Sequence, residues 1–339
     1  MMTIALKHAV RFADFNLDIE TEIPAQGITG VFGASGSGKT TLLRCIAGLE
    51  QSAPHDRTPV HRRRIGFVFQ QPQLFLHMSV RKNIEYGLHR NAKSGPAIDD
   101  IAAMLDINNL LDRAPRSLSG GEAQRVSIAR VLCQSPRLIL MDEPLSAVDE
   151  RRRNDVLPYL DRLHTESAVP IIYVSHNIDE ICRLSDHLLV LDDGKVVAEG
   201  ELQQVLAMTN LPQLAGQNAG AVVSAVQAEY DVHDDLTAFD FPGGRLWVTG
   251  RYASSKVRLR VRASDVSLSL SKAESSTILN ILPAEIRRIE TESAATLLVS
   301  LQLGEAGLVA RITRRSSQAL NLRIGDRVFA QIKSVTVRR

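Results

Sequence analysis

The 339-residue sequence has three cysteines, no long apolar run and almost no net charge. Cys45, Cys133 and Cys182 lie far apart and form no Cys-x-x-Cys pair. This spacing argues against a disulfide framework and a zinc site, and fits a reducing cytoplasm. No apolar segment approaches the roughly 20 residues that a membrane-spanning helix needs. If the protein acts at a membrane, we therefore expect another chain to supply the spans.

The charge and the N-terminal residues exclude further classes. A formal net charge of +2 gives no overall attraction to nucleic acid or anionic lipid. We interpret the arginine runs at 62–64 and 151–153 as solvated helix or loop faces. The first residues lack a charged segment followed by a long apolar one, so we expect no secretory signal. The length suits two domains, and 44% apolar residues are ample for packed cores.

Residues 1–210 alternate short apolar runs with longer helical patterns, which indicates an α/β domain with a largely parallel, helix-covered sheet. A helix is expected over Glu122–Cys133. The expected buried strands are Ile28–Phe32, Ile65–Phe69, Leu138–Met141, Pro170–Val174 and Leu188–Leu191.

The pattern changes after this domain. Residues 211–221 contain proline and glycines typical of a linker, and we assign 211–273 to a linker and the first part of a β domain. Alternating apolar residues with glycine-containing turns predict a small all-β barrel, which we place at 274–339. The clearest expected strands of the tail are 257–261, 266–270, 296–301 and 327–332.

A glycine-rich loop follows the first expected buried strand and precedes a helix. It reads Gly33-Ala34-Ser35-Gly36-Ser37-Gly38-Lys39-Thr40-Thr41 and contains the pattern Gly-x-x-x-x-Gly-Lys-Thr. Its glycines let backbone N–H groups point at phosphate oxygens, and the helix start adds its positive dipole end. Lys39 supplies charge to the β- and γ-phosphates, and the Thr40 hydroxyl ligates Mg²⁺. The loop therefore predicts a site for ATP and Mg²⁺.

Two acids, Asp142 and Glu143, end the apolar run Leu138–Met141. At a strand terminus beside a phosphate loop, one carboxylate can hold Mg²⁺, often through water. A second carboxylate can orient and deprotonate the attacking water. Alone, the pair is equally consistent with a cap after a core strand. With the phosphate loop, it predicts Asp142 as a metal ligand and Glu143 as the general base.

The segment Leu118-Ser119-Gly120-Gly121-Glu122 lies between the phosphate loop and the acidic pair. In this order the three motifs resemble the ATP-binding cassette (ABC) family, in which two copies clamp ATP between the phosphate loop of one and the LSGG segment of the other. The resemblance implies a P-loop NTPase fold with a mostly parallel sheet and a helical subdomain. It also implies a homodimer in which Ser119, Gly120, Gly121 and Glu122 act in trans on the partner's ATP.

The same resemblance assigns three further residues. Gln70 is similar to the Q-loop glutamine, which ligates Mg²⁺ and senses the γ-phosphate. His176 is similar to the catalytic H-loop histidine, and Asp149 to the D-loop aspartate. One departure is Val148, where the family usually has leucine.

Two other features depart from the family pattern. The aromatic residue that stacks on adenine is either Phe12 or Phe15, and a core role fits both equally. Only thirty residues separate Lys39 from Gln70. This spacing indicates a trimmed β-hairpin, which leaves the antiparallel β-subdomain in doubt.

The cargo is indicated by two segments. Residues 71–84 resemble bacterial import ATPases, in which this stretch helps form a groove for a coupling helix of the membrane subunit. The tail, at 262–268, 275–284 and 331–335, resembles that of molybdate-import ATPases, which carry an OB-like barrel of the molbindin (Mop/TOBE) type.

Molybdate is a tetrahedral dianion, held by hydroxyls, N–H groups and an occasional lysine. The candidate ligands are Thr277, Asn280, Lys333 and Ser334. Soluble molybdate binders typically have Ser-x-Arg-Asn where this chain has Thr277 and Leu279, so a purely structural dimerisation barrel remains an equal alternative.

These resemblances imply the ATP-hydrolysing subunit of a molybdate importer, peripheral on the cytoplasmic face of the inner membrane. Its partners would be a second copy, an integral membrane permease and a periplasmic or lipid-anchored binding protein, with no nucleic acid. The alternatives are an importer of sulfate, tungstate or another solute, and a tail that switches the ATPase off when oxyanion is abundant. A soluble, non-transport ABC protein ranks lower, because the chain has one cassette and no heptad run.

Overall fold

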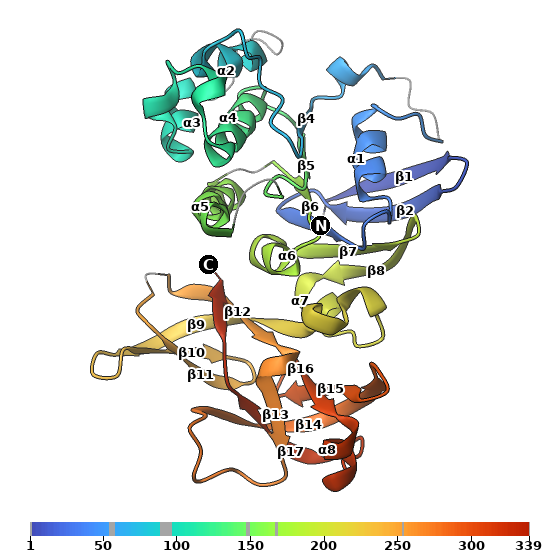
Figure 1. Cartoon of the computed structure of the whole chain (residues 1–339), viewed down its shortest axis with the longest axis vertical. Helices are drawn as coiled ribbons and strands as arrows, with labels where there is room; N and C mark the ends of the chain where they lie inside the picture. Colours follow the sequence, from blue (N-terminus) through green and yellow to red (C-terminus); the bar gives the residue numbers. More distant parts are fainter. Residues whose placement is uncertain are drawn as a thin grey trace. The chain divides into compact units, whose positions relative to one another are not determined.

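The computed structural model describes residues 2–53, 58–88, 97–146, 150–166, 169–252 and 254–338. They form two compact units, Met1–Glu199 and Gly200–Arg339 (Figure 1). Within the described ranges, no helix is both long enough and apolar enough to span a membrane. The domain limits expected from the sequence stay a prediction.

A six-stranded sheet forms the centre of the first unit, in the order β4-β5-β6-β3-β7-β8. The pairs β4–β5, β5–β6, β6–β3 and β3–β7 are parallel. Every residue of β3, β5 and β6 is buried, as expected for parallel strands covered on both faces. The strands predicted from apolar runs are confirmed to within two residues at either end. The five predicted strands are Ile28–Phe32 (β3), Ile65–Val68 (β4), Leu138–Asp142 (β5), Ile171–Val174 (β6) and His187–Asp192 (β7). The sixth strand, Lys195–Glu201 (β8), was not predicted.

A separate antiparallel hairpin of β1 (Thr3–Arg11) and β2 (Asn16–Pro24) accompanies the sheet. Its alternate side chains, such as Leu17 and Ile19, share a core with apolar residues of helix α1 (Lys39–Ala47). The antiparallel β-subdomain, in doubt at the sequence level, is therefore present in reduced form. Ala53 forms a single bridge to Ala9 at its edge, with both backbone N···O distances at 2.8 Å.

Arg63 closes the end of α1. Its Nη1 donates to the Ile46 carbonyl at 3.1 Å, and its Nε donates to Thr58 O at 3.0 Å. The guanidinium covers Gly48, which ends the helix with φ +75°. The short segment after α1 thus caps the helix that begins at the phosphate loop.

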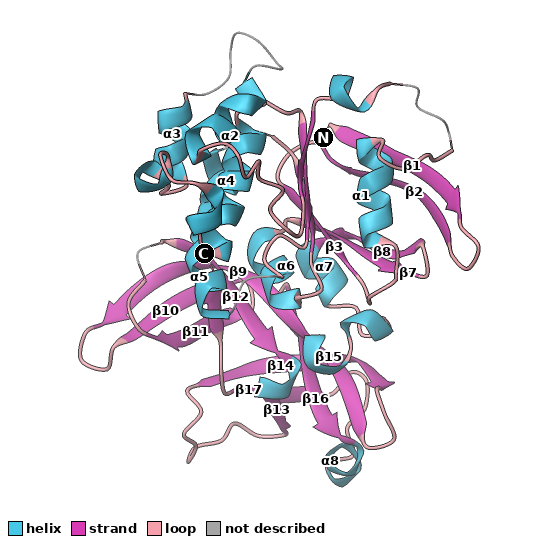
Figure 2. Ribbon diagram, turned by 45° about the horizontal axis from the view of Figure 1, so that its top comes forward, coloured by secondary structure: helices cyan, strands magenta, loops and turns pink. Residues whose placement is uncertain are grey.

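Helices α2, α3 and α4 group at one side of the sheet (Figure 2). Fully buried Asn83 holds the turn before α2. Its Oδ1 accepts from Phe75 N–H at 2.7 Å, and its Nδ2 donates to the carbonyls of Phe75, Met78 and Ser79 at 3.0–3.2 Å. The predicted helix Glu122–Cys133 is confirmed as α4, which begins two residues earlier. The helices of this unit after α1 are Val80–Leu88 (α2), Ile98–Met104 (α3), Gly120–Leu132 (α4), Glu150–Glu166 (α5) and Ile178–Leu184 (α6).

The second unit has two five-stranded sheets, ordered β11-β10-β9-β12-β18 and β13-β17-β14-β15-β16. All of its recorded strand pairings are antiparallel, and the two sheets share one apolar core that contains Phe239, Leu259 and Val299. The predicted all-β tail is confirmed. The elements are Leu202–Leu206 (α7), Gly220–Asp231 (β9), Leu236–Phe241 (β10), Gly244–Thr249 (β11), Lys256–Arg262 (β12), Val266–Ser269 (β13), Asn280–Thr291 (β14), Thr296–Leu303 (β15), Ala306–Thr313 (β16), Arg314–Ala319 (α8), Arg327–Ile332 (β17) and Thr336–Arg338 (β18).

The segment 211–221, expected as a linker, lies inside this second unit. It forms two short 3-10 helices, Pro212–Leu214 and Gly216–Asn218. Leu211 and Leu214 are buried. Its proline and glycines therefore lie in packed turns, and the segment is not an extended connection.

The turn between β7 and β8 generates a stability prediction. Gly194 has φ +74°, its N–H donates to Ser37 O at 3.1 Å, and its carbonyl accepts from Asp18 N–H at 2.8 Å. An added Cβ would collide with the Asn16 carbonyl oxygen. Gly194→Ala should therefore cost about 2–4 kcal/mol of unfolding free energy. Gly36→Ala, at φ +83° with open space around the Cβ, should cost only the left-handed strain of about 1–2 kcal/mol. Thermal unfolding of both variants checks this, and equal losses would contradict it.

Candidate functional site

The phosphate loop lies between β3 and α1, as the sequence predicts. Gly38 has φ +98° and immediately precedes α1, so the helix begins at Lys39. The side chain of Lys39 is 6% exposed, and its Nζ donates to Gly33 O at 2.8 Å and to Ala34 O at 2.7 Å. The ammonium is thus held inside the curve of the loop, beside the backbone that would wrap a phosphate.

Two carboxylates lie near this lysine. Burial lowers the pKa of Lys39, and the charges of Glu143 and Asp142 oppose that shift. Burial raises the pKa of Asp142, and the neighbouring Glu143 charge adds to the rise, whereas the Thr40 hydroxyl and Lys39 oppose it. The loop lysine and the strand-end acids therefore belong to one electrostatic cluster.

The expected Mg²⁺ ligands fit the ion in part. Thr40 Oγ1 donates to Asp142 Oδ1 at 3.0 Å, so a hydroxyl and a buried carboxylate already lie together. Mg²⁺ prefers such oxygen ligands, and commonly takes only one or two from protein, with phosphate and water completing the shell. In the described ranges, no group of three or more His, Cys, Asp or Glu residues forms an all-protein metal cage. Gln70 follows β4 and is exposed.

Glu143 has a strained and tightly held backbone. Its φ is +44°, in the left-handed region that residues other than glycine usually avoid. Its N–H donates to Val174 O at 3.0 Å, and its carbonyl accepts from Ser146 N at 3.1 Å and Ser146 Oγ at 2.9 Å. This backbone aims the carboxylate at His176, whose Nδ1 lies 3.0 Å from Glu143 Oε2. The two residues assigned to catalysis from the sequence are brought together by neighbouring strands.

The LSGG segment forms a complete capping box at the start of α4. Ser119 Oγ accepts from Glu122 N at 3.3 Å, and Ser119 N donates to Glu122 Oε2 at 2.7 Å. The backbone N–H of Ser119 lowers the pKa of Glu122, so this side chain stays an ionised acceptor. Glu122 thus builds the helix start, and the action of the segment in trans stays a prediction. Asp149 lies outside the described residues.

The two aromatic candidates for adenine differ in position. Phe15 packs against the phosphate loop, since a Cβ at Gly38 would lie 2.7 Å from its Cζ, and it also joins the core around Leu17. Phe12 is 43% exposed, with its ring centroid 6.3 Å from that of Phe15. Phe15 is the one in contact with the loop.

The sequence did not reveal a buried polar pair that includes the neighbour of His176. Ser175 and Glu180 are buried, and Ser175 Oγ donates to Glu180 Oε2 at 2.8 Å. An acid in the first turn of a helix is ordinarily explained by the helix dipole, so Glu180 did not stand out. The only signal is position, since Ser175 directly precedes His176.

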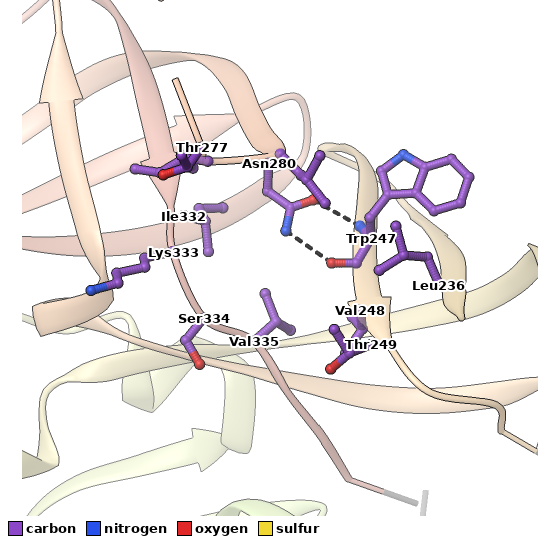
Figure 3. Close-up of a pocket in the computed structure, with 12 residues that line it drawn as sticks. Leu236, Trp247, Val248, Thr249, Thr277, Asn280, Ile332, Lys333, Ser334 and Val335 are labelled. Atoms are coloured by element: carbon purple, nitrogen blue, oxygen red, sulfur yellow. Dashed lines mark hydrogen bonds between the residues drawn. The ribbon is translucent and has the colours of Figure 1, made fainter. Parts of the chain in front are cut away.

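The four candidate oxyanion ligands of the tail line one cavity of about 550 Å³ (Figure 3). Asn280 is turned toward the backbone of Trp247, since its Oδ1 accepts from the backbone N–H at 2.7 Å and its Nδ2 donates to the backbone carbonyl at 2.9 Å. The Lys333 side chain extends away from this pair. Leu279, which stands where soluble binders have arginine, is 65% exposed. Asn280 therefore shapes the cavity wall, and Thr277, Lys333 and Ser334 are the more available groups.

Asp142 generates a pH prediction. Its pKa in the folded state lies above the unfolded value, so the folded protein holds this proton more tightly. The ionised carboxylate therefore costs stability at neutral pH, and the cost vanishes as the pH falls below the unfolded pKa. Asp142→Asn stays neutral and can still accept from Thr40, so it should stabilise the protein by about 0.5–2 kcal/mol at neutral pH.

Thermal unfolding across pH measures this difference. The gain of Asp142→Asn should shrink as the pH falls through the raised pKa. Asp192→Asn, at an exposed position, is the control and should change little. A gain for Asp142→Asn that does not depend on pH would contradict the role of the buried charge.

Comparison with known proteins agrees with this geometry. The ABC transporter family matches residues 17–146, and the TOBE domain family matches residues 276–338. The molybdenum import ATP-binding protein ModC 1 of Azotobacter vinelandii is 46% identical, over 98% of both chains. The ModC protein of Thiobacillus denitrificans is 48% identical, over 95% of this chain and 94% of its own.

Solved structures resemble the first unit. The ATP-binding cassette MJ0796, solved as a post-hydrolysis dimer with ADP and phosphate, is 26% identical with a TM-score of 0.51, covering 60% of this chain and 99% of its own. A nucleotide-free cassette of an ABC transporter has a TM-score of 0.54 at 24% identity, covers 63% of this chain and 100% of its own, and supports the fold. The expected fold class is confirmed, and the chain belongs to the molybdenum import ATP-binding proteins of the ABC transporter family.

Proposed function

We propose that this chain is the ATP-hydrolysing subunit of a bacterial molybdate importer. The observation that carries the catalytic part is the Glu143–His176 contact of 3.0 Å, at strand ends adjoining the phosphate loop. The molybdate part is supported by relatives that match nearly the whole chain and carry the name of molybdenum importers.

Each residue of the site has a proposed task. Lys39 neutralises the β- and γ-phosphates, while Thr40, Asp142 and Gln70 hold Mg²⁺, which screens phosphate charge when bound. Glu143 accepts a proton from the attacking water. His176 contacts the γ-phosphate and keeps Glu143 oriented through its Nδ1. Of the two aromatic candidates, we assign adenine stacking to Phe15, because its ring lies against the loop.

The working unit is proposed to be a homodimer. Ser119, Gly120 and Gly121 open α4, in a different part of the fold from the phosphate loop of their own chain, and so act on ATP bound to the partner. The related cassette MJ0796 was solved as a dimer in a post-hydrolysis state with ADP and phosphate. ATP closes the two copies and hydrolysis releases them. In the same assembly Asp149 serves as the D-loop aspartate.

The dimer is proposed to work on a membrane permease. Residues 71–84 form the contact for a coupling helix of the permease, with the half-buried Phe75 ring packed on Tyr86 at 4.6 Å between centroids. Two copies bind the permease on the cytoplasmic face of the inner membrane, and a periplasmic or lipid-anchored protein delivers the oxyanion. No nucleic acid takes part.

Two roles are proposed for the tail. Thr277, Lys333 and Ser334 offer hydroxyls and an ammonium to a tetrahedral dianion, and Asn280 fixes the strand that carries the cavity wall. Binding there would let the oxyanion regulate the ATPase. The alternative is a barrel that only dimerises, which the replacement of arginine by Leu279 favours.

Uptake of labelled molybdate into proteoliposomes with the co-purifying permease tests both the ATPase role and the cargo. Glu143→Gln should bind ATP, accumulate as a closed dimer and lose hydrolysis and uptake by at least about 100-fold, because the general base is gone. Lys39→Ala should instead fail to bind ATP. Full turnover by Glu143→Gln would contradict its role. Strong competition by sulfate or tungstate, or ATP hydrolysis without molybdate uptake, would indicate that the cargo is another solute.

Equilibrium dialysis of the full chain against molybdate tests the tail. Micromolar binding that falls at least about tenfold in Lys333→Ala is expected, because a charge-assisted contact is lost. Lys272→Ala, which changes an exposed lysine outside the cavity, is the matched control. Absence of binding at micromolar concentration would leave the dimerisation barrel as the role of this domain.

A further inference from the structure

A buried carboxylate lies next to Ser175, the residue that precedes His176. Glu180, on α6, is 4% exposed, and its Oε2 accepts from Tyr173 Oη and from Ser175 Oγ, both at 2.8 Å. Its Oε1 lies 3.2 Å from Arg153 Nε as an ion pair. Burial raises the pKa of the Tyr173 phenol well above its usual value, so this hydroxyl stays a donor. Three partners hold this buried charge in place, and two of them donate to the same oxygen, so Oε2 keeps one donor when the other is removed.

Ser175 connects this carboxylate to the turn that carries His176. Its hydroxyl donates to Glu180 and also accepts from Asn177 N–H at 3.0 Å. Asn177 Oδ1 in turn accepts from Asp179 N–H at 2.9 Å and caps α6. One buried hydroxyl therefore ties together the residues on both sides of His176.

The His176 side chain has little packing of its own. It is 57% exposed, so few neighbours fix its rotamer. Its direction is set mainly by the backbone between Ser175 and Asn177, together with the contact to Glu143 Oε2. A small error in this backbone moves the imidazole away from the reacting centre, and misplacement by about 1 Å can cost a hundredfold in rate.

Helices α5 and α6 also have a second link, away from this turn. Arg183 donates to Asp161 Oδ2 through Nε at 3.0 Å and through Nη2 at 2.6 Å. The two ion pairs join the same helices, but only that of Glu180 reaches the His176 turn. This difference separates general helix packing from an effect on His176.

We infer that Glu180 and Ser175 are positioning residues for His176, with the Ser175 hydroxyl as the link that holds the turn in the orientation needed for ATP hydrolysis. The inference rests on the proposed catalytic role of His176. Both side chains are buried, so we expect neither to contact ATP or the attacking water. Their loss should therefore lower kcat and leave the KM for ATP unchanged.

Ser175→Ala and Tyr173→Phe make a matched pair. Each removes one hydroxyl that donates to the same oxygen of Glu180 at the same distance, but only Ser175 also accepts from Asn177 N–H. We expect Ser175→Ala to lower kcat roughly tenfold with KM within about twofold, and Tyr173→Phe to keep the parent kcat. Equal kcat for the two variants would overturn the inference.

A double-mutant cycle identifies the route of the effect. In a His176→Ala background, Ser175→Ala should cause no further loss of single-turnover rate, because its effect passes through the imidazole. A second full loss would overturn the inference. Asp161→Asn, which breaks the other ion pair of α5 and α6, should keep kcat, and a tenfold loss there would mean that general loosening is responsible. Full turnover by His176→Ala would instead remove the proposed role of His176, a result that Ser175→Ala cannot mimic.

Discussion

The parallel pairing of β3, β5 and β6 is the constraint on which the site depends. Their register sets Val31 beside Val174, and Val174 beside Asp142. Because parallel strands end at the same edge, the phosphate loop, the acidic pair and the His176 turn leave the sheet together. Three segments, of which the phosphate loop lies more than a hundred residues before the other two in sequence, thus form one cluster. The apolar strands provide the rigidity, and the residues just beyond them provide the chemistry.

The polar part of the site is maintained at a cost in stability. Asp142 and Lys39 are buried, and Glu143 has a left-handed backbone. Each feature opposes folding, since burial disfavours the charged form of a side chain and a φ of +44° strains the backbone of a residue that has a Cβ. The surrounding apolar strands and the Ser146 bonds offset these terms. Stability and reactivity therefore compete at the same few residues.

Much of this arrangement could be predicted from the sequence. Continuous apolar runs located β3, β5 and β6, because strands buried on both faces need no polar alternation. The phosphate loop and Asp142–Glu143 stood out because each motif follows such a strand. The hairpin of β1 and β2 has the same alternation of apolar and polar residues that located the tail strands, but it was not predicted. Glu180 was missed because its contacts join α5, α6 and β6. Asn280 was predicted as an oxyanion ligand, but its amide is committed to the Trp247 backbone, a pairing that no linear pattern reveals.

The capping box of α4 has an evolutionary consequence. Its bonds occupy the N–H groups of Ser119 and Glu122, and Ala123 N–H bonds back to Ser119 O at 2.9 Å. In this part of the described chain, the first-turn donors that remain are the backbone N–H groups of Gly120 and Gly121. Only substitution by proline removes a backbone donor. Any other change at the two glycines keeps both N–H groups and adds a side chain over them, so most coding changes there block access to the donors without altering them.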